Sequence, residues 1–498
     1  KQKGFKYMVN SILPMMKGEN FKPVDIEGVH SNVYQAFQSM VENRMYNIGV
    51  KDAGSVNVWG NKISLNKVSN TIAGYTGSVL LTFNWLSSGA ASMQGNTLNM
   101  SEAFGGTNLT TTNMKNGHQM YLGDFKNVMG DIGRVVAKSK TNALLERYDP
   151  SGNYNGLQHK FAHRGVLKQT AAQGLQALNF THWQEHQVQA TLMYGLLDAV
   201  QLKTKEGNDI SLAELYMVDE NGNLGFKPVT DLTDVELRAI EQKAHRKIKE
   251  ITKKKHGNYD GANKAEYQRT VGGQQAGMLR KWLIPGIQHR FRNLTTMGKN
   301  FEELEDVDLY YNESGDEFQE GIYTTTARFL RQFNKELRTL QFTVVSAEWD
   351  KLTDKERGNI RQSIFEAGAM LGSYLAFLAF LAFAEDQDEE WAYVPAFYMR
   401  RLFGELAFYA YPMETFRILR SPAASLSMVE RLMGLATQGI YDTVQVATGG
   451  EATRYLQGER KGDLKLWRKT KQLLPVSAQI ERNVEEALGY LQQMMVNQ

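Results

Sequence analysis

The stretch AGAMLGSYLAFLAFLAFA, from Ala367 to Ala384, carries no charge and is more apolar than any other segment of the chain. As an α-helix it would be about 27 Å long, just short of the roughly 30 Å hydrocarbon core of a bilayer. The acidic residues Glu385, Asp386, Asp388, Glu389 and Glu390 follow at once. The stretch therefore has two interpretations, a helix packed in a protein core or a helix that can enter a membrane.

Small residues recur at every fourth position of this stretch, at Gly368, Gly372 and Ala376. This spacing gives one flat helix face, as in closely packed helix pairs. A second apolar segment follows, Trp391 to Pro412, but Arg400, Arg401 and Glu405 interrupt it. The pattern favours a buried helical hairpin in a large α-helical core over a membrane span. The residues expected to carry helix packing or membrane contact are Gly368, Gly372, Ala376, Phe377, Phe380 and Phe383.

The rest of the chain predicts a mainly α, elongated multi-helix assembly with an irregular N-terminal region and at most a short β-hairpin, near Glu214 to Phe226. Residues 56–65 have some character of a strand pair. Capping boxes at Ser211, Thr233 and Thr353 predict three helix starts. A helix-like segment at 70–96 is expected to break near Gly95. We expect an irregular region at 1–65, a helical domain at 66–205, capped helices with the hairpin at 206–300, an acidic loop at 301–322 and an apolar helical domain at 323–498.

The 498 residues have a formal net charge of +3, which gives no argument for a nucleic-acid partner. Cysteine is absent, which excludes disulfides, iron–sulfur clusters and thiolate zinc sites. The chain opens on Lys1, with no signal-peptide pattern, and reads like part of a longer polypeptide.

The strongest indication of an enzyme is His182-Trp183-Gln184-Glu185-His186, an HxxEH pattern. In inverted zinc peptidases this spacing puts both histidines on one helix face and lets the glutamate activate a metal-bound water. A third ligand is needed, and Glu241, Glu250 and Glu266 are available without a supporting motif. The alternative is an ordinary helix with polar residues on its exposed face, and we expect no metal, cofactor or catalytic site.

The basic end of the helix expected at 234–256 carries Lys249, Lys253, Lys254 and Lys255. These charges can complement the helix C-terminus, face an acidic partner, or contact nucleic acid without sequence specificity. The chain has no Walker A loop, no GxGxxG motif between a strand and a helix, and no GxSxG elbow.

Several phrases in the second half resemble very large internal virion proteins of tailed phages, in particular of crAss-like phages. They are GMLRKWLIPGIQHRF (277–291), EGIY (320–323), WDKLTDKERGN (349–359), ILRSP (418–422) and YLQGERKG (455–462). Their order resembles the C-terminal portion of such proteins over roughly residues 70–490. The phrases consist of packing and turn residues and contain no catalytic signature.

The resemblance implies a cargo or ejection protein, stored in the capsid or tail lumen and delivered into the host with the genome. It implies portal, tail-barrel or ring proteins as partners, further copies of the chain around the tail axis, and membrane contact only after delivery. Related virion proteins include an RNA polymerase marked by a DxDxD cluster, which this chain lacks. The alternatives are a permanent portal or tail-ring subunit, the zinc peptidase, and nucleic-acid binding by the basic helix.

Overall fold

The computed structural model describes residues 54–58, 61–69, 71–72, 84–131, 138–150, 180–219, 222–257, 283–292, 320–337, 349–387, 392–410, 424–448, 451–455 and 462–473. Within these residues the protein is mainly helical, as the sequence predicts. The helices are α4 (Trp85–Gly105), α5 (Thr111–Gly130), α6 (Lys140–Tyr148), α8 (Phe180–Asp198), α9 (Leu212–Leu215), α10 (Asp234–His256), α12 (Leu283–Phe291), α13 (Ile322–Leu337), α15 (Asp354–Gln387), α16 (Tyr393–Ala410), α18 (Ala424–Ala447) and α19 (Lys465–Leu473).

Six short strands form three antiparallel pairs, β1 (Ser55–Val58) with β2 (Asn61–Ser64), β3 (Gln201–Lys203) with β4 (Asp209–Ser211), and β5 (Tyr216–Val218) with β6 (Leu224–Phe226). The last pair is the predicted hairpin, and the first lies where a strand pair was considered. The β3–β4 pair was not predicted, so the limit of one hairpin was wrong.

The turns of β3–β4 and β5–β6 have the same construction. Gly207 has φ of 83° and Gly222 has φ of 82°, the left-handed region that glycine adopts without strain. The first residue of each turn accepts a hydrogen bond from an asparagine N–H four positions on: Asn208 N–H to Thr204 Oγ1 at 3.1 Å, and Asn223 N–H to Asp219 Oδ1 at 2.7 Å. The Gly-Asn pair at 207–208 was therefore a usable hairpin signal.

The three predicted capping boxes are formed. Ser211 and Thr233 cap α9 and α10, each with reciprocal bonds to the glutamate three residues on. Thr353 and Glu356 make the same pair of bonds at the start of α15. The predicted start of α10 therefore agrees with the structure at the residue level.

Helix α4 corrects one sequence prediction, because it continues through Gly95 without a break. A Cβ at Gly95 would lie 2.8 Å from Val188 Cγ1 on α8. Gly117 on α5 has the same role, because a Cβ added at this position would lie 2.6 Å from the Thr191 carbonyl oxygen. These glycines let α8 approach α4 and α5 closely, and the helices tolerate them because of that packing.

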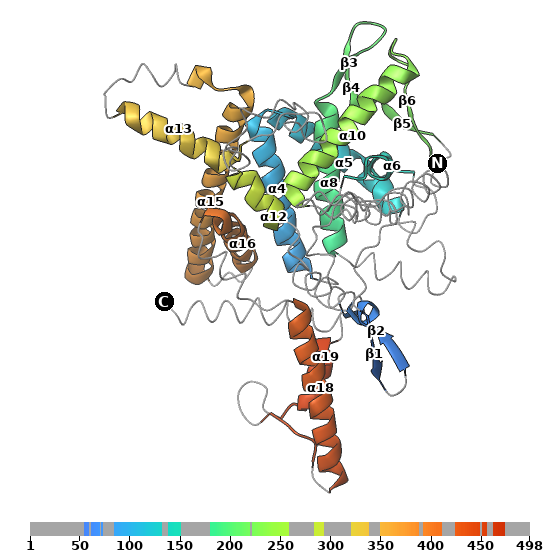
Figure 1. Ribbon diagram of the computed structural model, residues 1–498, viewed down its shortest axis with the longest axis vertical. Coiled ribbons are helices and arrows are strands. Elements are labelled where there is room, and N and C mark those ends of the chain that lie inside the picture. Colours follow the sequence, from blue (N-terminus) through green and yellow to red (C-terminus); the bar gives the residue numbers. More distant parts are fainter. Residues whose placement is uncertain are drawn as a thin grey trace, which may run out of the picture.

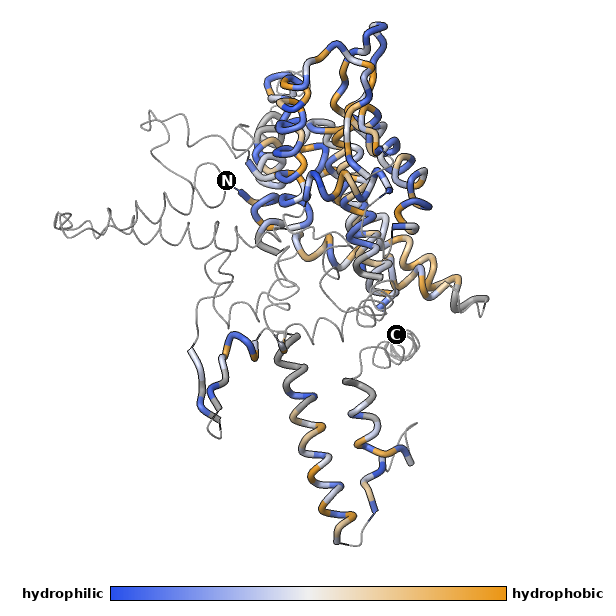
Figure 2. Tube along the Cα trace, turned by 90° about the vertical axis from the view of Figure 1, so that its right-hand side faces the viewer, coloured by the Kyte–Doolittle hydropathy of each residue, from blue (hydrophilic) through white to orange (hydrophobic). Residues whose placement is uncertain are grey.

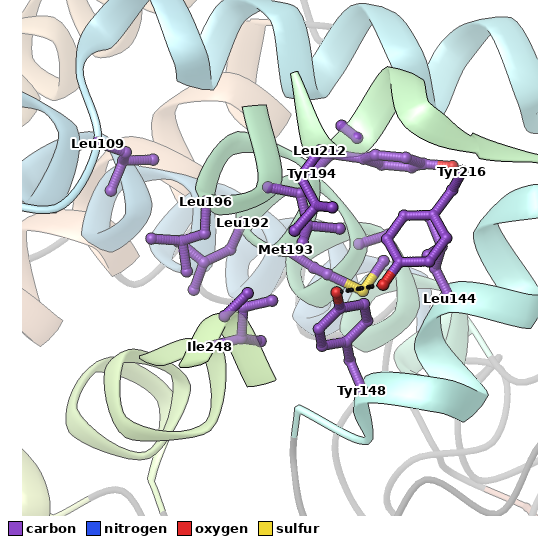
Figure 3. Close-up of a cluster of buried hydrophobic side chains, with 14 of the residues drawn as sticks. Leu109, Leu144, Tyr148, Leu192, Met193, Tyr194, Leu196, Leu212, Tyr216 and Ile248 are labelled. Atoms are coloured by element: carbon purple, nitrogen blue, oxygen red, sulfur yellow. Dashed lines mark hydrogen bonds between the residues drawn. The ribbon is translucent and has the colours of Figure 1, made fainter. Parts of the chain in front are cut away.

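A hydrophobic core lies among α5, α6, α8, α9 and α10 (Figure 3). Leu144, Leu192 and Ile248 are completely buried in it. Tyr148 and Tyr216 share a hydrogen bond of 2.7 Å between their hydroxyls, and Tyr216 also donates to Glu241 at 3.0 Å. Tyr148, Tyr216 and Glu241 therefore bond to each other within this core.

Helix α4 packs against α8 on one side and against α15 and α16 on the other (Figure 1). Residues of the predicted domains 66–205 and 323–498 thus meet in one helical body. Helices α18 and α19 pack against each other and extend away from that body in Figure 1. The predicted acidic loop lies outside the described residues, apart from 320–322.

Candidate assembly site: an exposed apolar hairpin rooted in buried charges

Helices α15 and α16 form an antiparallel hairpin, in which the Tyr374 and Phe403 rings lie 5.2 Å apart between centroids. Figure 2 shows the hairpin as a mostly orange segment that projects from the helical body. Among the described residues, α15 is the one helix long and apolar enough to cross a membrane, and 17% of that apolar window is buried. The expectation of a buried helix was therefore wrong for the single chain, because no described element covers the outer face of α15.

The small-residue face is open as well. A Cβ added to Gly368 or Gly372 meets no atom within 4 Å, whereas Ala376 is half-buried. Phe377 and Phe380 are half-buried, and Phe383 is exposed. The six predicted packing residues therefore lie together on one helix, but no described helix of the same chain packs closely on the glycines.

The root of the hairpin is fixed by a buried ion pair. Arg290 on α12 donates two hydrogen bonds to the Glu366 carboxylate on α15, each 2.9 Å long, and both side chains are almost completely buried. Tyr323 on α13 donates to the same carboxylate at 2.8 Å. The Arg290 guanidinium lies 3.7 Å from the Tyr409 ring centroid on α16, within cation–π range. One arginine therefore joins α12, α13, α15 and α16.

A second buried pair lies next to the first and corrects the predicted basic patch. Lys255 is completely buried, with Nζ 3.2 Å from Glu102 Oε2 on α4. It also contacts His289 Nε2 at 3.0 Å and donates to Gln362 Oε1 at 2.9 Å. A run of lysines at the end of a helix usually faces solvent, but the last turn of α10 directs the Lys255 side chain inward. Lys249 lies 3.8 Å from Asp149 Oδ2, and Lys253 and Lys254 are half-buried, so the four lysines do not form one exposed surface.

We call these two adjoining pairs, with their partners and the neighbouring His256, the polar seam; its members are Glu102, Lys255, His256, His289, Arg290, Tyr323, Gln362, Glu366 and Tyr409. Burial alone would raise the pKa of Glu102, but Lys254, Lys255 and the Asn108 amide outweigh it and lower the pKa to about 2. Burial lowers the pKa of Lys255 to about 8 despite the nearby Glu102. The Glu102–Lys255 pair is therefore ionised at neutral pH.

Both seam histidines are neutral at neutral pH. Burial and the charge of Lys255 lower the pKa of His256 to about 4, and the same two causes hold the pKa of His289 well below its usual range. His256 Nε2 lies 2.8 Å from Asn99 Oδ1, so it joins the end of α10 to α4 as a neutral donor.

The HxxEH segment lies at the start of α8, and of its two histidines only His186 has a described side chain. His186 is buried, with Nε2 2.8 Å from Asn142 Oδ1 and Nδ1 3.4 Å from the Tyr121 hydroxyl. The His182 side chain lies outside the described part of the structure. In the described part, no three His, Asp or Glu side chains come together in a group that could hold a metal ion.

Comparison with known proteins gives no relative: no family model, no curated protein and no solved structure matches this chain. The site therefore rests on its own geometry. Sequence reasoning missed Glu102, His289, Gln362 and Glu366. One usable signal was present, because Gln362 and Glu366 are four residues apart and so share one face of α15 directly before the apolar run.

Proposed function

We propose that this chain is a cargo protein of a tailed-phage particle, stored near the portal and delivered with the genome, with no enzymatic activity in this segment. The phrases that resemble crAss-like virion proteins support the virion part of the proposal. The hairpin supports the assembly part, since a helix of 34 residues leaves its apolar face to be covered by something outside the described chain. That exposed face is the observation that carries the proposal.

The construction of the chain suits passage through a narrow channel. α15 and α16 are neighbours along the sequence, so their pairing needs little long-range search, and such pairs re-form quickly. The sequence holds no cysteine, so no disulfide has to break before the chain elongates. A stored protein of this kind breaks and re-forms only non-covalent contacts when it unfolds and refolds.

A permanent portal or tail-ring subunit is the second candidate, because an exposed apolar face would serve a fixed ring equally well. The two functions differ in the fate of the protein. A cargo protein leaves the particle with the genome, and a ring subunit stays.

Quantitative mass spectrometry of intact and genome-released particles separates the two. The cargo function predicts peptides of this chain in intact particles and their loss, relative to the major capsid protein, after release. Full retention after release would establish the ring subunit instead. Absence from both kinds of particle would end the virion proposal.

A further inference from the structure

One stripe of α15 faces outward from Arg361 to Ala382. Its members follow each other in alternating steps of three and four residues, the spacing that keeps side chains on one face of a helix in a coiled coil. Ile364, Leu371, Leu375 and Leu378 are 59%, 58%, 55% and 39% exposed. The members in order are Arg361, Ile364, Gly368, Leu371, Leu375, Leu378, Ala382 and, by helical register, Glu385.

A bilayer fits this hairpin poorly. Because Tyr374 lies beside Phe403, the rise of about 1.5 Å per residue in both helices places Arg400 and Arg401 level with Phe377 and Ala376. Both arginines are exposed, and they lie at the middle of the apolar run. A hairpin inserted across a membrane would hold them near the bilayer centre, where each arginine costs roughly 2.5–3.5 kcal/mol or more.

We propose that the outer stripe of α15 pairs with the same stripe of a second copy of this chain, in antiparallel orientation around a two-fold axis near residue 373. In such a pair the contacting residues form layers. A residue of one copy lies opposite the residue of the other copy that is equally far from position 373 in the opposite direction along the sequence. The layers are Arg361 with Glu385, Ile364 with Ala382, Gly368 with Leu378, and Leu371 with Leu375. Each layer occurs twice, once on either side of the axis, as an isologous interface requires.

The residues of each layer complement each other in size and charge. Leu378 of one copy meets Gly368 of the other, where the space beside the glycine is open, and Ile364 meets Ala382. Small residues opposite large ones let two helices approach closely. The stripe is basic at one end and acidic at the other, so the antiparallel orientation joins opposite charges at both ends, whereas a parallel pair would join like charges.

The contact is long enough to be specific. From Ile364 to Ala382 the stripe is about 27 Å long at 1.5 Å per residue. The seam holds α15 to the body near Gln362 and Glu366, so the stripe is presented by a fixed helix. The exposed guanidinium of Arg361 lies near Gly106 at the end of α4, 3.6 Å from the place of a Cβ there. It therefore lies at the end of the stripe, beside the C-terminus of α4.

This inference deepens the assembly role proposed above, but its test does not depend on the virion. Sedimentation of the purified full chain measures pairing in solution, whereas the particle measurement tests location. The wild-type chain is expected to form a concentration-dependent dimer. Leu371→Asp with Leu375→Asp is expected to weaken dimerisation at least a hundredfold, with an unchanged far-ultraviolet circular dichroism spectrum because both side chains are exposed.

Charge reversal tests the orientation. Arg361→Glu alone and Glu385→Arg alone are each expected to weaken the dimer by about three- to tenfold, because each change puts like charges together twice. The double variant R361E/E385R is expected to restore wild-type affinity. Arg246→Glu, at an exposed position of α10 remote in sequence, is the matched control and is expected to change nothing.

Three results would overturn the proposal. The first is a wild-type chain that stays monomeric at all concentrations. The second is a double charge variant no better than the single ones. The third is a chain that is monomeric in water but floats with neutral phosphatidylcholine vesicles because α15 binds them. That result would show that the outer face of α15 contacts lipid and not a second copy.

Discussion

The two sides of α4 show two ways of holding helices together. On the α8 side, α5, α6, α8 and α10 meet around fully buried leucines, and the Tyr148 and Tyr216 hydroxyls pair within the core. On the α15 side, α10, α12, α13, α15 and α16 meet around two buried ion pairs, Lys255–Glu102 and Arg290–Glu366. Apolar burial tolerates many arrangements of similar volume, but a buried ion pair is stable in one geometry. We therefore infer that the seam fixes the direction of the hairpin and the apolar core supplies most of the stability.

The largest expected effect comes from breaking one ion pair of the seam. Glu366→Gln leaves the Arg290 charge buried without its counter-charge, so the free energy of unfolding should fall by about 3–5 kcal/mol in urea titrations. The double variant R290M/E366L removes both charges and should lose far less. A single variant that loses under about 1 kcal/mol would show that the pair does not hold the hairpin.

Cutting the apolar core should have a comparable or slightly smaller effect. Leu192→Ala removes a completely buried side chain of α8 and should lower the free energy of unfolding by about 2–5 kcal/mol. The matched control is Val235→Ala at an exposed position of α10, for which about 0.5 kcal/mol or less is expected. Equal losses of stability in the two variants would argue against a stabilising role for this apolar core.

Acid should weaken the seam before the core. The pKa of His256 is about 4 in the folded chain against an ordinary 6.5, so below pH 6.5 the unfolded chain binds a proton that the folded chain excludes. Stability should therefore fall as the pH drops through this window, by about 2 kcal/mol at pH 5 from this residue. His289 adds in the same direction, and the loss from Glu102 begins below its ordinary pKa of 4.5.

The variant His256→Gln isolates that contribution. Its free energy of unfolding should change less between pH 7 and pH 5 than that of the wild-type chain. An identical pH dependence in both proteins would show that His256 does not contribute to the loss of stability in acid.

The last contrast uses two helical glycines. Gly117→Ala should destabilise by about 1–3 kcal/mol, because its Cβ would lie 2.6 Å from a backbone oxygen of α8. Gly372→Ala meets nothing and should stabilise α15 by up to about 1 kcal/mol through helix propensity. Thermal unfolding at equal concentrations measures both, and the same sign in both variants would contradict the difference between the two faces.

Local signals predicted much of the secondary structure. The capping boxes at Ser211, Thr233 and Thr353 placed three helix starts, because a cap is a contact between residues three apart. The hairpin near Glu214 to Phe226 was found from its Asn-Gly turn. The β3–β4 hairpin was missed because strands of three residues are too short to show alternation, although Gly207 and Asn208 gave the turn.

The errors concern contacts between residues far apart in the chain. Gly95 was taken for a helix break, but its role depends on Val188. Lys255 was assigned to a surface patch, but its burial depends on Glu102 and Gln362. The apolar run was expected to be buried, and burial depends on which elements reach it. Helix periodicity gives the faces of α15 but not what covers each face.

Disulfide cross-linking tests most directly whether the outer face of α15 belongs to a second copy. The chain has no cysteine, so every thiol in the experiment is an introduced one. A mixture of the full-length variants Arg361→Cys and Glu385→Cys should form a mixed disulfide dimer under mild oxidation, and neither variant alone should cross-link efficiently. Cross-linking of each variant with itself, or none in the mixture at concentrations where the wild-type chain sediments as a dimer, would contradict the antiparallel pair.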